Sequence, residues 1–183
     1  MKGTPMIRHD KTVFASLLMI VGALCLLIPA ALAVPTNGLV AYYPFSGNAD
    51  DASGNANHGT VVGATLTNDA AGNADSAYYF NGSGDYISLS GFLGNSSNGT
   101  IAAWAYVESY DLGFNQLNLI YGQNDNLQFG LGDSSISADG KWVLRHRSGG
   151  MNNVIGPLAT TGTWVHVAGV WTGTEIILYL DGE

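Results

Sequence analysis

The chain has 183 residues and a formal net charge of −8, from six lysines and arginines against fourteen aspartates and glutamates. So acidic a chain is repelled by phosphate backbones, which excludes nucleic acid as an expected partner. The single cysteine, Cys25, allows no disulfide within the chain, so the fold must be stabilised by packing alone.

The first 33 residues have the order of a secretory signal peptide. Three bases precede an uncharged apolar run over 13–28, and the small residues of "PAALA" end at Ala33. We therefore expect an apolar N-terminal signal helix over 1–33, cleaved after Ala33, and one domain over 34–183. The expected location is secreted or cell surface, either extracellular or periplasmic. An uncleaved membrane anchor is the alternative, because the apolar run is slightly long.

Short runs rich in Val, Ile, Tyr, Trp and Thr recur along the rest of the chain, separated by clusters of Gly, Asn, Asp and Ser. Many evenly spaced strands without a helical period predict an antiparallel sandwich or barrel with almost no helix. The runs are LVAYYPF (39–45), SAYYFN (76–81), DYISLS (85–90), TIAAWAYV (100–107), LNLIYG (117–122), LQFGLG (127–132), KWVLRHR (141–147), TWVHVAGVW (163–171) and EIILYLDG (175–182).

Two of these runs are apolar at both alternating sets of positions. In 100–107 and in 163–171 neither face reads as solvent-facing, so we expect both strands to be covered on both sides. The last run enters the turn Asp181-Gly182, a strong hairpin signal. No second strand follows it, so we interpret the chain as a fragment whose last strand has an unpaired edge.

Four stretches in this order carry a family resemblance: GLVAYYPFSGNADDASGNANHGTVVGATL (38–66), SAYYFNGSGDYISL (76–89), GTIAAWAYV (99–107) and TWVHVAGVWTGTEIILYLDGE (163–183). They resemble the laminin-G-like jelly-roll domains of bacterial secreted proteins, in the concanavalin A-like lectin and glucanase superfamily. The Trp-x-His-Val and Tyr-x-Asp-Gly patterns also resemble pentraxins. The resemblance implies an all-β, two-sheet antiparallel jelly-roll sandwich that commonly binds calcium, glycans or other extracellular partners. Family members continue past this hairpin, so the domain is expected to lack its last strands.

The stretch DDASGNANHG (50–59) has the composition of a turn. It also offers the carboxylate and amide oxygens that calcium prefers, from Asp50, Asp51, Asn55 and Asn57. The residues alone favour a solvated turn. The resemblance places the family aspartate on Asp51 and adds Asp85 as a distant ligand, so together they predict a structural calcium ion. For Asp85 a turn residue at a strand start is the alternative.

The histidines and acids do not form a catalytic pattern. His58 and His166 lack the spacing of zinc ligands, and His166, between valines, is expected to be buried and hydrogen-bonded. Glycoside hydrolysis needs two carboxyl groups beside one bond. The Glu-x-Asp-x-x-Glu pattern of the glucanase relatives is absent, so we expect no enzymatic activity.

Sugar binding needs exposed aromatic side chains. Trp104, Tyr106 and Tyr110 are the candidates, although aromatic residues in strands more often pack in the core. We predict a secreted, non-catalytic binding or adhesion module whose partner is an extracellular glycan or a surface protein, with carbohydrate binding and a structural calcium. The alternatives are a structural or protein-binding module without sugar specificity, and an accessory domain of a larger extracellular glycoside-active enzyme.

Overall fold

The computed structural model describes residues 37–89, 96–109, 118–123, 126–147 and 152–183, and these form an all-β structure of antiparallel sheets. The predicted signal helix and its cleavage point lie outside these ranges. Within them no helix is long and apolar enough to cross a membrane. The elements are β1 (Thr60–Val62), β2 (Thr65–Thr67), β3 (Ala77–Tyr79), β4 (Tyr86–Ser88), β5 (Gly99–Tyr106), β6 (Asn118–Gln123), β7 (Leu127–Leu131), the 3-10 turn η1 (Ser134–Ile136), β8 (Lys141–His146), β9 (Asn152–Leu158), β10 (Trp164–Trp171) and β11 (Ile176–Leu180).

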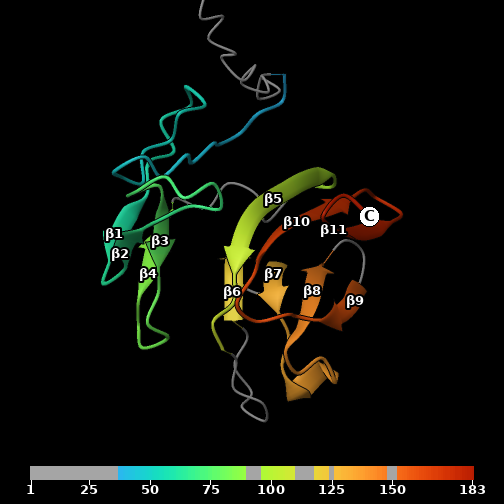
Figure 1. Ribbon diagram of the computed structural model, residues 1–183. Coiled ribbons are helices and arrows are strands. Elements are labelled where there is room, and N and C mark those ends of the chain that lie inside the picture. Colours follow the sequence, from blue (N-terminus) through green and yellow to red (C-terminus); the bar gives the residue numbers. More distant parts are fainter. Residues whose placement is uncertain (1–36, 90–95, 110–117, 124–125, 148–151) are drawn as a thin grey trace, which may run out of the picture. The chain divides into compact units, whose positions relative to one another are not determined.

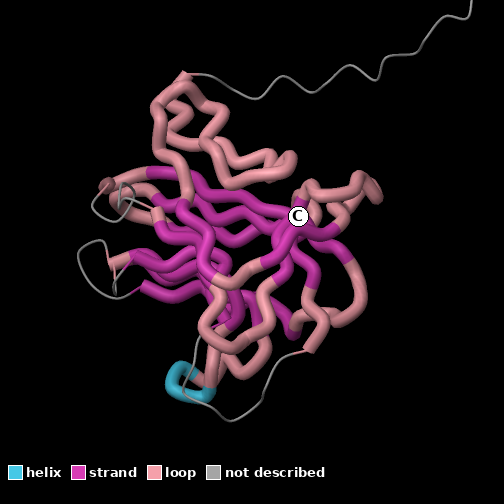
Figure 2. The backbone as a smooth tube through the Cα atoms, turned by 90° about the vertical axis from the view of Figure 1, so that its left-hand side faces the viewer, coloured by secondary structure: helices cyan, strands magenta, loops and turns pink. Residues whose placement is uncertain are grey.

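Two larger sheets form a β-sandwich. One has the strand order β11-β10-β5 and the other β6-β7-β8-β9, while β1 pairs with β4 and β2 with β3 (Figure 1). The short turn η1, in the connection between β7 and β8, lies outside the layers of strands (Figure 2). The buried cluster between the two sheets takes alternate residues from both: Leu127, Phe129, Leu131, Trp142, Leu144, Ala159, Val167 and Trp171.

Eight of the nine predicted runs contain a strand, and the run 39–45 does not. In that run Phe45 has a φ of 54°, which ends any extended path. The sequence also did not predict β1, β2 or β9. The first two have only three residues each, and β9 contains Gly156 and Pro157, which weaken a strand signal.

The prediction that 100–107 is covered on both faces is wrong. In the described residues β5 pairs only with β10, and its burial alternates along the strand. One face packs toward the core, while Trp104 and Tyr106 on the other are 58% and 46% exposed. Alternation of residue types shows which side chains share a face, but not whether that face has a partner.

Trp171 anchors the core at one end of β10. It is fully buried, its indole Nε1 donates to the Ser96 carbonyl at 3.1 Å, and its ring stacks on His146. Its partner across the strands is Gly99. A Cβ atom at Gly99 would lie 2.3 Å from Trp171 Cζ2, so a glycine is needed for this close approach.

We expect Gly99→Ala to lower the free energy of unfolding by about 1–3 kcal/mol, because the added methyl displaces a ring that has no room to move. Chemical denaturation measures this. Gly173→Ala is the control, since nothing lies within 4 Å of a Cβ there. Equal effects of the two substitutions would contradict the packing described for Trp171.

Candidate functional site

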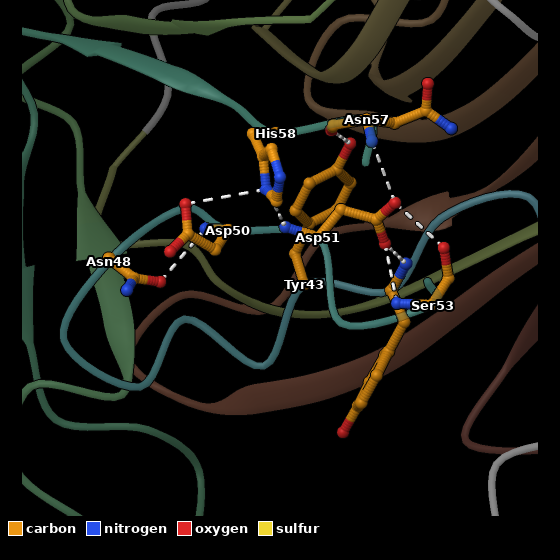
Figure 3. A network of polar contacts seen from close by, with 8 residues as sticks. Tyr43, Asn48, Asp50, Asp51, Ser53, Asn57 and His58 are labelled. Atoms are coloured by element: carbon orange, nitrogen blue, oxygen red, sulfur yellow. Dashed lines mark hydrogen bonds and ion pairs between the residues drawn. The ribbon is translucent and has the colours of Figure 1, made fainter. Parts of the chain in front are cut away.

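The loop 50–59 is organised around the carboxylate of Asp51, which is only 6% exposed. One oxygen accepts from the backbone amides of Tyr42 (2.9 Å) and Ser53 (2.8 Å), and the other from the Ser53 hydroxyl (2.8 Å) and the Asn57 amide (3.0 Å) (Figure 3). Burial raises the pKa of Asp51, but these hydrogen bonds outweigh it and hold the pKa well below its usual range. The ionised carboxylate therefore organises the loop.

The same loop binds the segment that precedes it. The side-chain amide of Asn55 donates to the carbonyls of Leu39 (2.8 Å) and Val40 (3.0 Å), and that of Asn57 donates to Val40 (2.9 Å). The Ala52 amide donates to the Tyr42 carbonyl at 2.8 Å. These side chains satisfy backbone groups that a neighbouring strand would satisfy in a sheet.

Tyr43 and His58 also contact the charged groups of this loop. The Tyr43 hydroxyl donates to the Asn57 carbonyl, and burial together with the Asp51 charge raises the pKa of Tyr43 to about 12. His58 Nδ1 accepts from the Asp51 amide at 3.2 Å and lies 3.5 Å from Asp50 Oδ1 (Figure 3). The contact between His58 and Asp50 is an ion pair only when the imidazole is protonated.

The Asp51 carboxylate does not fit a calcium ligand in this arrangement. A carboxylate has about four acceptor positions, and chain donors already occupy four on Asp51. The side-chain oxygens of Asp50, Asn55 and Asn57 are the remaining candidates. Among the described residues no three His, Cys, Asp or Glu side chains cluster as metal ligands. Calcium at this loop therefore stays a prediction.

The structure does not bring Asp85 to the Asp51 loop. Asp85 accepts from the Asn81 amide at 2.9 Å, and its carboxylate lies against Gly63, just after β1. The Asp51 loop instead reaches β1 from its other end, where the Gly59 amide donates to Ala49. Gly63 lies four residue steps of extended chain beyond Gly59, which is about 13 Å.

We expect Asp51→Asn to lower the free energy of unfolding by about 2–3 kcal/mol at neutral pH, because it removes a charge that four donors surround. The lowered pKa means that this contribution is fully present above about pH 4 and is lost as the pH falls further. Thermal melts of the wild-type chain and of Asp51→Asn between pH 7 and pH 2 measure the difference in stability, which should become smaller as the pH falls. Asp50→Asn is the control, since its side chain is 64% exposed. A difference that does not change with pH would contradict this role of Asp51.

A second candidate site lies on the outward face of β5 and β10. Trp104 lies opposite His166 and Tyr106 opposite Trp164, with ring centroids 5.3 Å and 5.5 Å apart. We call these four residues the aromatic face. The sequence predicted its two residues on β5, Trp104 and Tyr106, as ligand-binding candidates, but not the two on β10. The alternation of side chains along β10 places Trp164 and His166 on one face, and this signal could have identified them. The third predicted ligand residue, Tyr110, lies outside the described residues.

The prediction that His166 is buried is wrong, because it is half-buried on this outward face. The buried histidine is His146, which alternates with Trp142 and Leu144 on the core side of β8. No described residue forms a hydrogen bond with its ring nitrogens by geometry, and burial lowers its pKa, opposed only by the nearby Ser96 carbonyl. His146 therefore acts as a neutral core residue.

The rest of this outward surface is uncharged. The other outward positions of the three strands are Thr100, Ala102, Ala168, Val170, Ile177 and Tyr179. Ile177 is among the exposed large apolar residues. A surface of this kind is suited to stacking against an apolar or amphipathic ligand and not to binding an ion.

Comparison with known proteins gives a family match that includes one of the two candidate sites and leaves out the other. A family model described as the concanavalin A-like lectin/glucanases superfamily, of the laminin G type, matches residues 81–183. That range holds β4 to β11, including the aromatic face, and leaves out the Asp51 loop. No curated protein matches the chain, and no solved structure does. The chain belongs to the laminin-G-like family of the concanavalin A-like lectin/glucanases superfamily.

Proposed function

We propose that the chain is a secreted, non-catalytic module with a two-sheet jelly roll that binds an extracellular glycan on its aromatic face. Membership of this family supports a carbohydrate-binding or protein-binding role. The observation that favours a glycan is the pairing of Trp104 with His166 and of Tyr106 with Trp164 on a sheet face where Trp104 and Tyr106 are 58% and 46% exposed. The order of bases, apolar run and small residues at the amino terminus supports export.

Rings fixed by sheet pairing form a preorganised surface. Trp104 and Tyr106 are two residues apart on one strand, so they lie on the same face about 7 Å apart. Each is buttressed from β10 by a tilted or edge-on ring contact. Such a row presents flat aromatic faces to the C–H surfaces of successive sugar rings, at little cost in side-chain entropy.

Binding without hydrolysis is the simpler expectation for this face. Its outward strand positions carry no carboxyl group, whereas glycosidases place two within about 5–9.5 Å of each other. The nearest acid in sequence to the face is Glu108, two residues after Tyr106 and past the end of β5. Asp181, just past β11, accepts a hydrogen bond from the His166 amide at 2.9 Å. Asp181 thereby caps the end of the strand pair.

An exposed apolar face is also what a protein partner would use. The two functions differ in what a substitution does. A sugar depends on the ring of one or two aromatic residues, whereas a protein interface extends over the aliphatic positions as well, including Val170 and Ile177. Binding that is lost with Ile177→Ser but kept with Trp104→Ala would favour the protein-binding alternative.

Trp104→Ala is expected to weaken binding to a glycan identified on a carbohydrate array by at least about tenfold, because it removes the most exposed ring of the face. Calorimetric titration measures the affinity. The melting temperature should change little. Tyr86→Ala, at a ring of similar exposure on β4, is the control and should leave binding unchanged. If the wild-type chain binds none of the glycans on the array, the proposal is contradicted.

The calcium prediction has its own test. If calcium is held by Asp50 with the oxygens of Asn55 and Asn57, saturating calcium should raise the melting temperature relative to chelator, by mass action on the folded state. The rise should disappear in Asp50→Asn. An unchanged melting temperature at millimolar calcium would contradict calcium binding without bearing on the aromatic face.

A further inference from the structure

The strand β5 forms an open edge of its sheet. It lies at the end of the strand order β11-β10-β5, and among the described residues it pairs only with β10 (Figure 1). Its eight residues, Gly99–Tyr106, include no charged side chain and no proline, and its register with β10 has no bulge. Proteins usually protect an exposed edge strand with charges, prolines or bulges, because its unpaired backbone groups bind other strands. β5 has none of these protections.

The pairing of β5 with β10 shows which of its backbone groups are unpaired. The His166 carbonyl accepts a hydrogen bond from the Asp181 amide at 2.8 Å, so His166 bonds toward β11. Its neighbours Val165 and Val167 therefore bond toward β5, where they lie opposite Ala105 and Ala103. The alternate residues of β5 then point their amides and carbonyls away from β10: Thr100, Ala102, Trp104 and Tyr106. No described residue forms a hydrogen bond with these groups.

The core side of the same edge is incompletely covered. Ile101, Ala103, Ala105 and Val107 pack against the buried cluster but are themselves only partly buried. On the neighbouring strand β10, by contrast, Val167 is fully buried. A further strand beside β5 would therefore remove apolar surface from water as well as satisfy backbone groups.

The sequence of β5 is complementary to itself in one antiparallel register. When Ala103 lies opposite Ala103 of a second copy, Ala102 lies opposite the second copy's Trp104 and Thr100 opposite its Tyr106. All the outward backbone groups of both strands are then paired, and each large side chain faces a small one. The core side repeats this match of large and small residues: Ile101 with Ala105, and Val107 with Gly99.

From this edge we infer that the chain forms a homodimer by antiparallel pairing of β5 with β5 of a second copy, with Ala103 at the two-fold axis. Charge favours the second copy as well, because the nearest acid in sequence, Glu108, lies opposite Asn98 in this register and not opposite another acid. The dimer joins the three strands of each copy into one sheet and places the two aromatic faces side by side. The inference rests on the open edge and does not depend on the proposed function.

Sedimentation equilibrium of the whole chain, from nanomolar to submillimolar concentration at physiological salt, measures the dimerisation constant. Ala102→Glu should weaken dimerisation at least tenfold, because it places two like charges at diagonal positions across the new strand pair. The control Ala168→Glu adds the same charge opposite Ala102 on β10, one strand away from the edge, and should weaken dimerisation less than threefold. Thermal melts check that both variants fold, since both side chains lie on the outward face of the sheet.

A cross-link tests the register itself. With the single native cysteine removed by Cys25→Ser, Ala103→Cys brings two thiols to directly opposed positions, with Cα atoms about 4.5 Å apart, which a disulfide can bridge. The control Ala105→Cys displaces the thiols by four residues along the strands, about 13 Å. We expect a covalent dimer on a non-reducing gel from Ala103→Cys alone.

The dimer inference is overturned if the wild-type chain stays monomeric up to submillimolar concentration. It is also overturned if Ala102→Glu weakens dimerisation no more than Ala168→Glu does, or if Ala105→Cys cross-links as readily as Ala103→Cys.

Discussion

The antiparallel pairing of β5 with β10 runs in unbroken register from Gly99 opposite Trp171 to Tyr106 opposite Trp164. Because side chains alternate across a strand, this one register determines both surfaces of the sheet. Inward it brings Val167 and Trp171 against the second sheet. Outward it places four rings in two facing pairs. A slip of one residue would exchange the two faces, so the buried core fixes the position of the exposed rings.

The Asp51 loop holds a neighbouring segment, residues 39–43, that pairs with no strand among the described residues. The carbonyls of Leu39 and Val40 accept hydrogen bonds from the side-chain amides of Asn55 and Asn57, and the Tyr42 amide donates to Asp51. The loop itself closes on the buried Asp51 carboxylate. An ionised group at this depth is stable only because donors surround it. The arrangement explains the dense Asp, Asn, Ser and Gly composition without invoking an ion.

Much of the fold was predictable from local patterns in the sequence. Strand alternation located β5, β7, β8 and β10, because each carries several consecutive residues of high strand propensity. Which of the two faces of a strand is exposed was not predictable, since the exposure of Trp104 depends on which other strands pack against it. The same limit applies to the histidines. His146, flanked by arginines, is buried, and His166, flanked by valines, is half-exposed, because face and neighbouring sheet decide burial and not the adjacent residues.

For the candidate site too, the residue types were predictable from the sequence and their contacts were not. Residue types identified Asp51 as the central member of its loop, but only geometry shows that its oxygens are occupied by chain donors.

The four tryptophans give the most direct test of the glycan-binding account. Trp104 and Trp164 lie on the aromatic face, whereas Trp142 and Trp171 are buried between the sheets. Indole N–H signals in a proton–nitrogen correlation spectrum can be followed during titration with a glycan that the chain binds. The account predicts that the signals of Trp104 and Trp164 shift together and saturate, while those of Trp142 and Trp171 stay in place. Saturable binding that leaves Trp104 and Trp164 unchanged would contradict it.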